Sequence, residues 1–373
     1  MTSATANGRQ PALPLRVAHV TTERGFGGGE VQVLLLMNGL AARGVQQTLW
    51  CPPGAAIGER ARQRGFEVRE LRMGSYLSFG SVLRLRSGLR EHDIAHLHTG
   101  RASWLGSLAA RLAGVPRVIT RRTMRKVRPG WRSRLVYGGD RVAVVAISNS
   151  VADVLRAGGV DEARLSVVLD SVDLDRIPIK LGRDAVRAAL GVAANEVLAL
   201  GVGKLSVGKG FDVLVDAVAQ LSGLPLKVAV AGDGPEREAL AARIRDRGLQ
   251  GRFSLLGQRS DVGDLLEACD LLVMPSRHEG LGNAAMEAMG RSRAVVASRA
   301  GGLSELIDSG SNGLLVPPDD PAALASAIRQ LTQDAAMRAT FAAAGPARLD
   351  RGMRPAQGVD SYMRIYARCA ARV

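Results

Sequence analysis

Two glutamates separated by seven residues, Glu279 and Glu287, have the spacing in this chain that most clearly suggests chemistry. The apolar stretch Leu271–Pro275 before them predicts a buried strand, and the Ala- and Met-rich stretch after Gly282 favours a helix. We therefore expect Glu279 in a strand-to-helix loop and Glu287 in the first turns of the helix. Free backbone N–H groups at a helix start bind anions, and carboxylates accept hydrogen bonds from hydroxyl groups. A ligand that carries both phosphate and polyol, such as a sugar nucleotide, fits this combination.

A second motif is the glycine-rich loop 201–210, which follows a predicted strand and carries Lys204 and Lys209. Two lysines five residues apart can bind a diphosphate as point charges. The loop is not a P-loop, because Gly210 rather than Ser or Thr follows Lys209. Solvated lysines in an ordinary turn are the alternative interpretation of this motif when it is taken alone.

Glycines also follow the first predicted strand, where 25–29 includes Gly28 and Gly29. Glycines before a helix let a ligand approach the backbone at the helix N-terminus. The spacing is not that of a dinucleotide fingerprint, and no acidic residue ends the next predicted strand, so NAD is disfavoured. A plain tight turn is the alternative.

His96 and His98 lie at the end of another predicted strand. Strand alternation places both on one face, and His98 is nearer the carboxyl end, where ligands of open α/β sheets bind. Histidine pairs also serve structural roles. The other histidines are scattered along the chain, and no Cys or Asp cluster accompanies them, so we expect no metal site.

The composition narrows the class of partner. The chain has 373 residues, a formal charge of +15 and a pI of about 10.9, which predicts an anionic partner unless the arginine excess reflects the coding genome. Three widely spaced cysteines predict a reducing, cytoplasmic setting. Met1–Leu13 lacks a signal-peptide core, and no apolar run approaches the roughly 18 residues needed to span a bilayer. We expect a cytoplasmic protein, peripheral on the inner face of the cytoplasmic membrane at most.

The densest basic run, Arg121–Leu135, contains a tryptophan and no acidic residue. Basic residues interleaved with Trp suit an anionic membrane surface or a phosphorylated lipid acceptor. A solvated basic face is the alternative. The residues assigned to membrane or acceptor binding are Arg121, Arg122, Arg125, Lys126, Arg128, Trp131 and Arg132.

Strand-like apolar runs alternate with helical patterns in two series along the chain. This alternation predicts an α/β fold with two Rossmann-like, doubly wound parallel-sheet domains. We place these domains at residues 1–175 and 176–355, and expect a helix at 356–373 that packs back on the first domain. The predicted strands are Leu15–Val20, Gln47–Cys51, Glu67–Leu71, Ile94–His98, Arg117–Thr120, Ala143–Ile147, Ser166–Leu169, Val197–Val202, Lys227–Ala231, Phe253–Leu256, Leu271–Pro275, Ala294–Ser298 and Gly313–Val316.

Five motifs occur in a fixed order in the second half: Gly-Lys-Leu…Lys-Gly, Gly-Asp-Gly-Pro, Pro-Ser…Glu-Gly-Leu-Gly…Glu-Ala-Met, Gly-Gly…Glu-Leu-Ile and Asn-Gly-Leu-Leu-Val. This order resembles the C-terminal half of family 4 retaining glycosyltransferases of GT-B architecture. Gly-Gly-Gly-Glu, His-Leu-His and Ile-Ser-Asn-Ser in the first half agree with it. The resemblance covers nearly the whole chain, and the pair of glutamates is its most specific part.

The resemblance implies that two Rossmann-like domains face each other across a cleft that holds the donor. Lys204 and Lys209 would bind the diphosphate, Glu287 the ribose hydroxyls, and Glu279 the transferred sugar, which His98 would also contact. The implied catalytic residues are Glu279, His98 and Lys209. The implied donor-binding residues are Gly28, Gly29, Lys204, Lys209, Gly280, Leu281, Gly282, Asn283 and Glu287.

This chain departs from many members of the family at two places. Lys204 stands where many relatives have Arg, so a bidentate phosphate contact becomes a point charge. Asp170-Ser171 stands where many have Asn-Gly, which affects the expected geometry of the loop between the domains.

The implied activity is that of a retaining, hexosyltransferase-type enzyme with a nucleotide-diphosphate sugar as co-substrate. The acceptor would be a glycan or lipid-linked molecule in bacterial cell-envelope polysaccharide or lipopolysaccharide synthesis, and neither a cofactor nor a metal would be required. A basic nucleic-acid-binding protein on a GT-B shell is an alternative, which the 3% aromatic content disfavours, so no nucleic acid is expected. A catalytically silent nucleotide-sugar sensor is another, which the intact Glu279, Glu287 and Lys209 disfavour.

Overall fold

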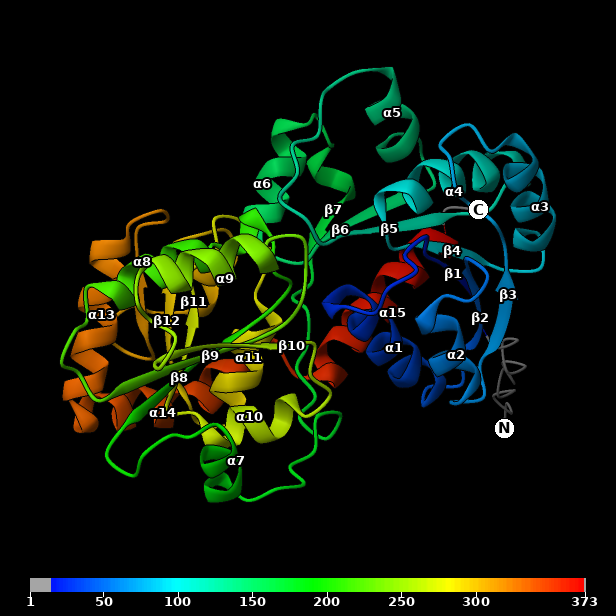
Figure 1. The fold of residues 1–373 in the computed structure, drawn as a ribbon. Coiled ribbons are helices and arrows are strands. Elements are labelled where there is room, and N and C mark those ends of the chain that lie inside the picture. Colours follow the sequence, from blue (N-terminus) through cyan, green and yellow to red (C-terminus); the bar gives the residue numbers. More distant parts are fainter. Residues whose placement is uncertain (1–14, 372–373) are drawn as a thin grey trace, which may run out of the picture. The chain divides into compact units, whose positions relative to one another are not determined.

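The computed structural model describes residues 15–371, so the prediction about a signal peptide in Met1–Leu13 lies outside the described residues. The chain forms two parallel β-sheets with helices between the strands (Figure 1). The first sheet has the strand order β3-β2-β1-β4-β5-β6-β7, and the second has the order β10-β9-β8-β11-β12-β13. The predicted α/β fold class is confirmed.

The first sheet and its helices occupy the first half of the chain. Its strands are β1 (Arg16–Val20), β2 (Gln46–Cys51), β3 (Glu67–Glu70), β4 (Ile94–Leu97), β5 (Arg117–Arg121), β6 (Val142–Ala146) and β7 (Leu165–Val167). Its helices are α1 (Gly28–Ala41), α2 (Ala56–Arg62), α3 (Phe79–Leu89), α4 (Gly100–Ala113), α5 (Trp131–Tyr137) and α6 (Asn149–Ala157). Every strand predicted in this half is present, with ends that differ by one or two residues.

The second sheet agrees with its prediction equally well. Its strands are β8 (Val197–Val202), β9 (Leu226–Ala231), β10 (Phe253–Gly257), β11 (Leu271–Met274), β12 (Ala294–Ser298) and β13 (Leu314–Val316). The helices of this half are α7 (Arg183–Ala189), α8 (Phe211–Ala219), α9 (Arg237–Asp246), α10 (Val262–Ala268), α11 (Asn283–Gly290), α12 (Leu303–Leu306), α13 (Pro321–Gln333), α14 (Ala335–Leu349) and α15 (Pro355–Ala370). Strands β11 and β12 are buried along their whole length, as expected for parallel strands covered on both faces.

Both sheets share one topological feature that matters for function. In the first sheet β2 and β3 lie on one side of β1, and β4 to β7 lie on the other. In the second sheet β9 and β10 lie on one side of β8, and β11 to β13 lie on the other. The strand order therefore reverses between β1 and β4 and between β8 and β11. In doubly wound sheets, ligands bind beyond the carboxyl ends of the strands at this switch point. The loops after these four strands are therefore the segments in which to look for a site.

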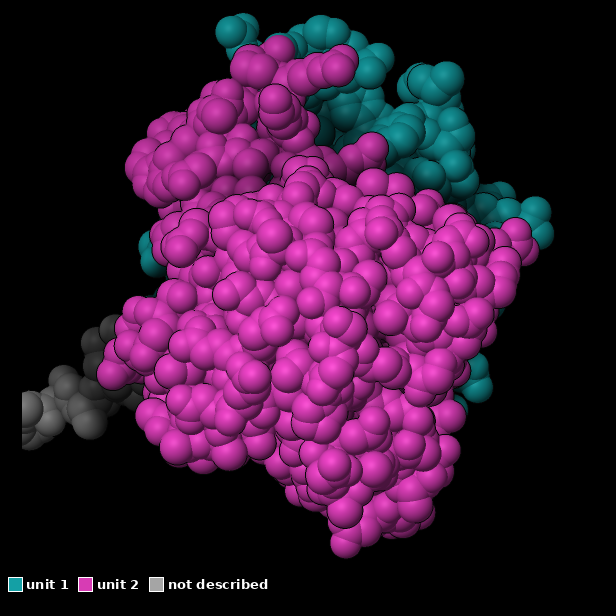
Figure 2. All heavy atoms as spheres, turned by 60° about the vertical axis from the view of Figure 1, so that its left-hand side comes forward, with its two compact units in different colours: residues 1–120, 130–144, 362–373 teal, residues 121–129, 145–361 magenta. Residues whose placement is uncertain are grey.

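Contacts divide the chain into two compact units (Figure 2). Unit 1 comprises residues 1–120, 130–144 and 362–373, and unit 2 comprises 121–129 and 145–361. The predicted boundary at 175/176 and the predicted role of the last helix stay predictions. Within unit 1, Tyr366 near the end of α15 is completely buried, and its hydroxyl lies 2.7 Å from His96 Nδ1. In the described part of the chain, 15–371, no helix has the length and apolar character needed to cross a membrane.

Candidate functional site

The switch point of the second sheet brings Lys209 and Glu279 together. Lys209 Nζ donates to Glu279 Oε2 over 2.5 Å, and Ser276 Oγ donates to the same oxygen over 3.2 Å. The Lys209 side chain is 26% exposed and that of Glu279 13%. Because the ammonium group is partly open to solvent, an anion that arrives there would share it with Glu279. The predicted diphosphate and sugar residues are thus neighbours.

Hydrogen bonds and ion pairs connect the loop that carries Glu279 to the loop after β8 and the start of α8. The backbone N–H groups of Arg277 and His278 donate to Gly208 O over 2.9 and 3.3 Å. The Arg277 guanidinium donates to both carboxylate oxygens of Asp212 over 2.8 and 2.7 Å and to Asp319 over 2.5 Å. Hydrogen bonds from Arg277 lower the pKa of the Asp212 carboxyl. These contacts hold the two switch-point loops of unit 2 in a fixed arrangement.

Glycines allow other segments to reach the backbone around Glu279. A Cβ at Gly280 would lie 2.5 Å from Arg122 O, and one at Gly302 would lie 2.3 Å from Gly280 O. At Gly301, where φ is +52°, it would lie 2.0 Å from Glu279 O. Such distances exclude any side chain without backbone movement. The glycines that the sequence marked as turns are therefore needed for packing around this site.

Glu287 lies on α11 as predicted, but it already has a partner. Its side chain is 11% exposed and accepts a hydrogen bond from the Arg176 guanidinium. Burial raises the pKa of the Glu287 carboxyl, while Arg176 and Arg291 act in the opposite direction. A ribose bound at Glu287 would share the carboxylate with Arg176. Sequence reasoning missed Arg176 because it lies at the predicted boundary between the two domains and belongs to no recognised motif.

The other residues of unit 2 that were predicted to bind the sugar donor lie in the same two loops or at the start of α11. Lys204 is exposed, so Lys209 is the lysine of the pair that reaches Glu279. Leu281 is buried, Gly282 has φ of +107° and caps α11, and Asn283 is the first residue of that helix. Their roles in donor binding stay predictions.

In unit 1 the loops after β1 and β4 also meet at the switch point. Gly28 and Gly29 begin α1, and the Glu30 carboxylate accepts a hydrogen bond from Gly27 N over 3.0 Å. The hydroxyls of Thr22 and Thr99 are 2.7 Å apart and connect the two loops.

His98 is buried and joins a histidine that the prediction left out. Its Nε2 lies 2.9 Å from Nδ1 of His19 in β1. The ring centroids of His96 and His98 are 4.0 Å apart, which confirms that these two side chains share a face. Parallel pairing of β1 with β4 places His19 directly beside His96, and this explains how a residue so distant in sequence reaches His98.

Hydrogen bonds determine which nitrogen of His98 carries a proton. Gln47 Nε2 donates to Met37 O over 2.9 Å, so Gln47 Oε1, 3.0 Å from His19 Nε2, can only accept. His19 therefore carries its proton on Nε2. In the neutral ring, His19 Nδ1 then accepts from His98 Nε2. This chain fixes the tautomer of a neutral His98 with its proton on Nε2.

The prediction that the other histidines are scattered is wrong for His19. Ring nitrogens of His19, His96 and His98 lie within 4.8 Å of one another, close enough to bind one metal ion. Both nitrogens of His96 already have partners, the hydroxyls of Tyr366 and Thr120, each at 2.7 Å. The cluster is therefore well hydrogen-bonded as it stands, and the expectation that no metal is needed stays a prediction.

The basic run is less uniform than its sequence suggests. The Arg122 side chain is 11% exposed and donates to the buried carboxylate of Asp170 over 3.3 Å. The Arg121 guanidinium donates to the backbone oxygens of Thr123 and Arg125. Of the seven residues assigned to membrane or acceptor binding, Arg125, Lys126, Arg128, Trp131 and Arg132 are exposed. Their predicted role at a membrane or acceptor stays a prediction.

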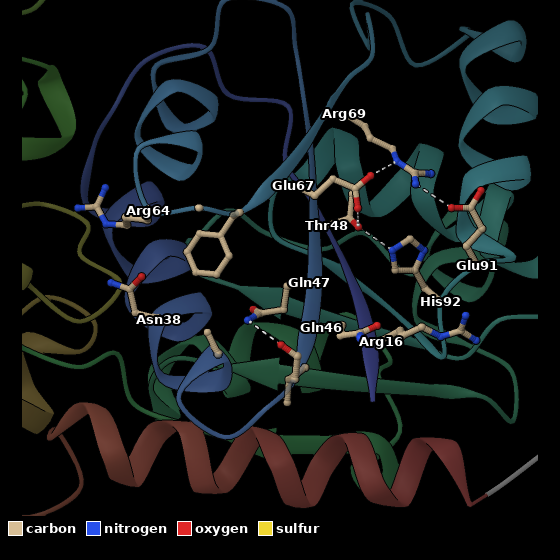
Figure 3. A pocket seen from close by; sticks show the side chains of 14 residues that line it. Arg16, Asn38, Gln46, Gln47, Thr48, Arg64, Glu67, Arg69, Glu91 and His92 are labelled. Atoms are coloured by element: carbon tan, nitrogen blue, oxygen red, sulfur yellow. Dashed lines mark hydrogen bonds and ion pairs between the residues drawn. The ribbon is translucent and has the colours of Figure 1, made fainter. Parts of the chain in front are cut away.

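A pocket of about 780 Å³ lies at the other end of the first sheet (Figure 3). Residues from the amino ends of three neighbouring strands line it, including Arg16, Gln46 and Glu67. Three of its charged side chains pair with one another, since Arg69 donates to Glu67 over 2.6 Å and to Glu91 over 2.7 Å. Because ligands of doubly wound sheets bind at the carboxyl ends, we do not assign this pocket to the site.

Comparison with known proteins decides the family. Residues 26–176 match the model of Glycosyltransferase Family 4, and residues 196–334 match that of Glycosyl transferases group 1. The chain is 34% identical over 370 residues to 2-deoxystreptamine N-acetyl-D-glucosaminyltransferase of Streptomyces fradiae, with 87% of each chain covered. The chain belongs to glycosyltransferase family 4. The resemblance predicted from its motifs is confirmed, and the protein is a glycosyltransferase.

Two further similarities are informative. The lipopolysaccharide core biosynthesis glycosyltransferase LpsE of Rhizobium meliloti is 34% identical over 181 residues, which is 48% of this chain and 53% of that protein. The crystal structure of Anabaena HepE in complex with UDP-glucose superposes with a TM-score of 0.85 at 23% identity, covering 95% of this chain and 100% of that one. The structural likeness confirms the predicted GT-B fold.

Proposed function

We propose that this glycosyltransferase moves a hexose from a nucleotide-diphosphate donor to a glycan or lipid-linked acceptor in cell-envelope synthesis, with retention of configuration. The observation that carries the proposal is the Lys209–Glu279 pair at the switch point of the second sheet. It combines a cation suited to a diphosphate with a carboxylate suited to sugar hydroxyls. The likeness to HepE, whose crystal contains UDP-glucose, makes a UDP-sugar the first donor to test.

In this mechanism Lys209 neutralises the charge that develops on the departing diphosphate. Glu279 and the backbone N–H groups from Gly280 onward orient the transferred sugar, Glu287 binds the ribose, and His98 contacts the sugar from unit 1. The acceptor hydroxyl attacks from the face that the diphosphate leaves, so no covalent glycosyl-enzyme is required, in contrast to retaining glycosidases. Catalysis then depends on positioning and charge stabilisation.

We also propose that no divalent metal takes part, because Lys209 supplies the positive charge that a metal would otherwise provide. Activity should therefore survive treatment with EDTA. Loss of transfer that manganese restores would contradict this part of the proposal.

The acceptor assignment is supported by the likeness to LpsE and by the charge of +15, which favours an anionic acceptor or membrane surface. A small polyol or aminocyclitol acceptor is the second candidate, supported by the likeness to the Streptomyces fradiae transferase. The same charge disfavours a cationic aminocyclitol. We propose that the enzyme works at the inner face of the cytoplasmic membrane.

The decisive experiment is thermal denaturation with a panel of UDP-, GDP- and ADP-sugars. A sugar donor at about 100 times its Kd stabilises the folded protein by about 2.7 kcal/mol. For the correct donor, Lys209→Ala should lower turnover by about 100-fold, roughly 3 kcal/mol, a loss larger than any fall in Tm explains, because Glu279 keeps its hydrogen bond from Ser276. Lys180→Ala, which removes an exposed lysine outside the site, is the matched control.

Two results would overturn the proposal. One is that no nucleotide sugar shifts Tm, and the other is that Lys209→Ala transfers sugar at the wild-type rate. Salt-sensitive oligonucleotide binding without any transfer would favour the nucleic-acid alternative.

A further inference from the structure

Exposed large apolar side chains gather on one part of unit 1. Tyr76, Leu77, Phe79 and Leu83 are 54%, 75%, 72% and 60% exposed. They occupy the loop before α3 and the first turns of that helix, outside the basic run that the sequence singled out (Figure 1). Single exposed apolar residues are ordinary, but four within eight positions form a patch that calls for a partner.

Helix α3 is apolar on two sides for different reasons. Val82, Leu85 and Leu89 are buried and provide its contact with the rest of unit 1. Phe79 and Leu83 are four residues apart, so they lie next to each other on the helix surface, and both are exposed. The second apolar side is therefore not explained by the packing of unit 1.

The patch continues onto α5 through Trp104 of α4. Trp104 Nε1 donates to Tyr76 O over 2.9 Å, and its ring meets the ring of Trp131 edge-on with centroids 5.8 Å apart. Trp131 is 65% exposed, and the Arg132 guanidinium lies 5.2 Å from its ring centroid. We call Tyr76, Leu77, Phe79, Leu83 and Trp131 the docking face.

The segments that carry the docking face contain basic but no acidic residues, and the acidic residues next to them in sequence include Glu70, Glu91 and Asp140. The sequence contains no Asp or Glu from Leu71 to Arg90, nor from Ile94 to Gly139, and these stretches include α3, α4 and α5. The exposed arginines of these elements and their flanks are Arg84, Arg90, Arg111, Arg132 and Arg134. An apolar centre with a basic surround complements a surface that is apolar inside and anionic at its boundary.

We propose that the docking face inserts into the headgroup–acyl boundary of an anionic lipid bilayer. Aliphatic and aromatic side chains enter this boundary, while the surrounding arginines remain at the level of the lipid phosphates. A second copy of the chain is a poorer partner, because pairing two such faces would bring the arginines of both copies together. The inference does not depend on the proposed sugar transfer, since lipid binding needs no donor.

The test uses the full-length protein and sedimentation with vesicles of phosphatidylcholine containing increasing fractions of phosphatidylglycerol. Wild-type protein should bind more strongly as the anionic fraction rises and more weakly as salt is added. The triple variant Leu77→Ser/Phe79→Ser/Leu83→Ser should partition at least about tenfold less at every lipid composition. The double variant Ile179→Ser/Leu181→Ser, which removes exposed apolar side chains from unit 2, should bind like wild type.

Further measurements separate the possible outcomes. An unchanged Tm and an unchanged shift with nucleotide sugar would show that the triple variant is folded, so weak binding by it then supports the proposal. Brominated acyl chains should quench tryptophan fluorescence in wild type, and Trp131→Phe should reduce that quenching to the part that comes from the neighbouring Trp104. The proposal is wrong if the triple variant binds anionic vesicles as well as wild type. It is equally wrong if light scattering shows a wild-type dimer that the triple variant dissociates while vesicle binding stays the same.

Discussion

The switch points of the two sheets share glycine-rich turns, but the glycines have different surroundings. In unit 2 a Cβ at Gly210, in the loop after β8, would lie 2.0 Å from Pro275 O. In the turn after the neighbouring β9, a Cβ at Gly232 would lie 1.8 Å from Gly203 O and one at Gly234 2.2 Å from Leu205 O. In unit 1 a Cβ at Gly25 would meet no atom within 4 Å. The same sequence signal, glycine after a strand, therefore has two causes.

The polar groups of the two switch points differ in the same way. In unit 2 they are charged pairs, Lys209 with Glu279 and Arg176 with Glu287. In unit 1 they form a hydrogen-bonded chain from Gln47 through His19 to His98 that contains no carboxylate, lysine or arginine. Unit 2 is thus charged and tightly packed around Gly210 and Gly232, whereas Gly25 of unit 1 is exposed and its position has room for a Cβ.

The largest difference should appear when alanine replaces a glycine in each unit. Gly232 has φ of +155° and no room for a Cβ, so Gly232→Ala should cost about 3 kcal/mol or more and lower Tm by roughly 5 °C or more. Gly25→Ala should change stability by no more than about 0.5 kcal/mol. Thermal denaturation of both variants measures this.

Turnover of the Gly25 variant sharpens the comparison. If Gly25 leaves space for a ligand, Gly25→Ala should transfer sugar more slowly at an unchanged Tm. Equal losses of stability in the two variants would contradict the distinction between packed and open glycine turns.

The features that sequence predicted well are local. Each strand is a short apolar run with a turn signal after it, and parallel strands covered on both faces are continuous apolar runs, as in β11 and β12. Glu279 and Lys209 could be placed at strand ends for the same reason. Their proximity then follows from the strand order of the sheet, because the loops after β8 and β11 meet at its switch point.

The features that sequence missed depend on pairing between distant segments. His19 reaches His98 only because β1 lies beside β4 in one register, across 79 positions of sequence. Arg176 reaches Glu287 across 111 positions and from a stretch without periodicity. Nothing near either residue in the sequence indicates its partner. The docking face depends less on distant pairing. Its residues Phe79 and Leu83 are apolar and stand at helical spacing in the sequence, but the basic run gave the stronger signal for membrane binding.

A smaller effect on stability and turnover should follow from interrupting the hydrogen-bonded chain Gln47–His19–His98 in unit 1. Gln47→Leu removes the Gln47 acceptor of the His19 Nε2 proton, and loss of a buried hydrogen bond of this kind costs about 0.5–1.5 kcal/mol. The tautomer of His98 is then no longer fixed. Long-range 1H–15N spectra of the histidine rings should show a change at His19 and His98, and turnover should fall.

Gln47→Glu tests the same contact in the opposite direction. Its carboxylate still accepts from His19 Nε2 but cannot donate to Met37 O, and its negative charge favours a protonated His19, so its ring spectra should differ from those of both wild type and Gln47→Leu. Identical ring spectra for wild type and Gln47→Leu would show that Gln47 does not set the protonation pattern of this chain.

The smallest effect concerns the pH dependence of the charged pairs in unit 2. Burial raises the pKa of the Glu287 carboxyl above its ordinary value of about 4.5, so the folded protein retains this proton to a higher pH than the unfolded chain. The stabilisation from this group is present in full below about pH 4.5 and is lost as pH rises through the folded-state pKa. The free energy of unfolding of Glu287→Gln should therefore increase relative to that of wild type as pH rises. Asp212 should show the opposite trend, because Arg277 lowers the pKa of its carboxyl. As pH rises through the acidic range, the free energy of unfolding of Asp212→Asn should fall relative to that of wild type. Guanidinium unfolding near pH 4 and pH 7 measures both trends, and parallel trends in the two variants would show that burial does not dominate at Glu287.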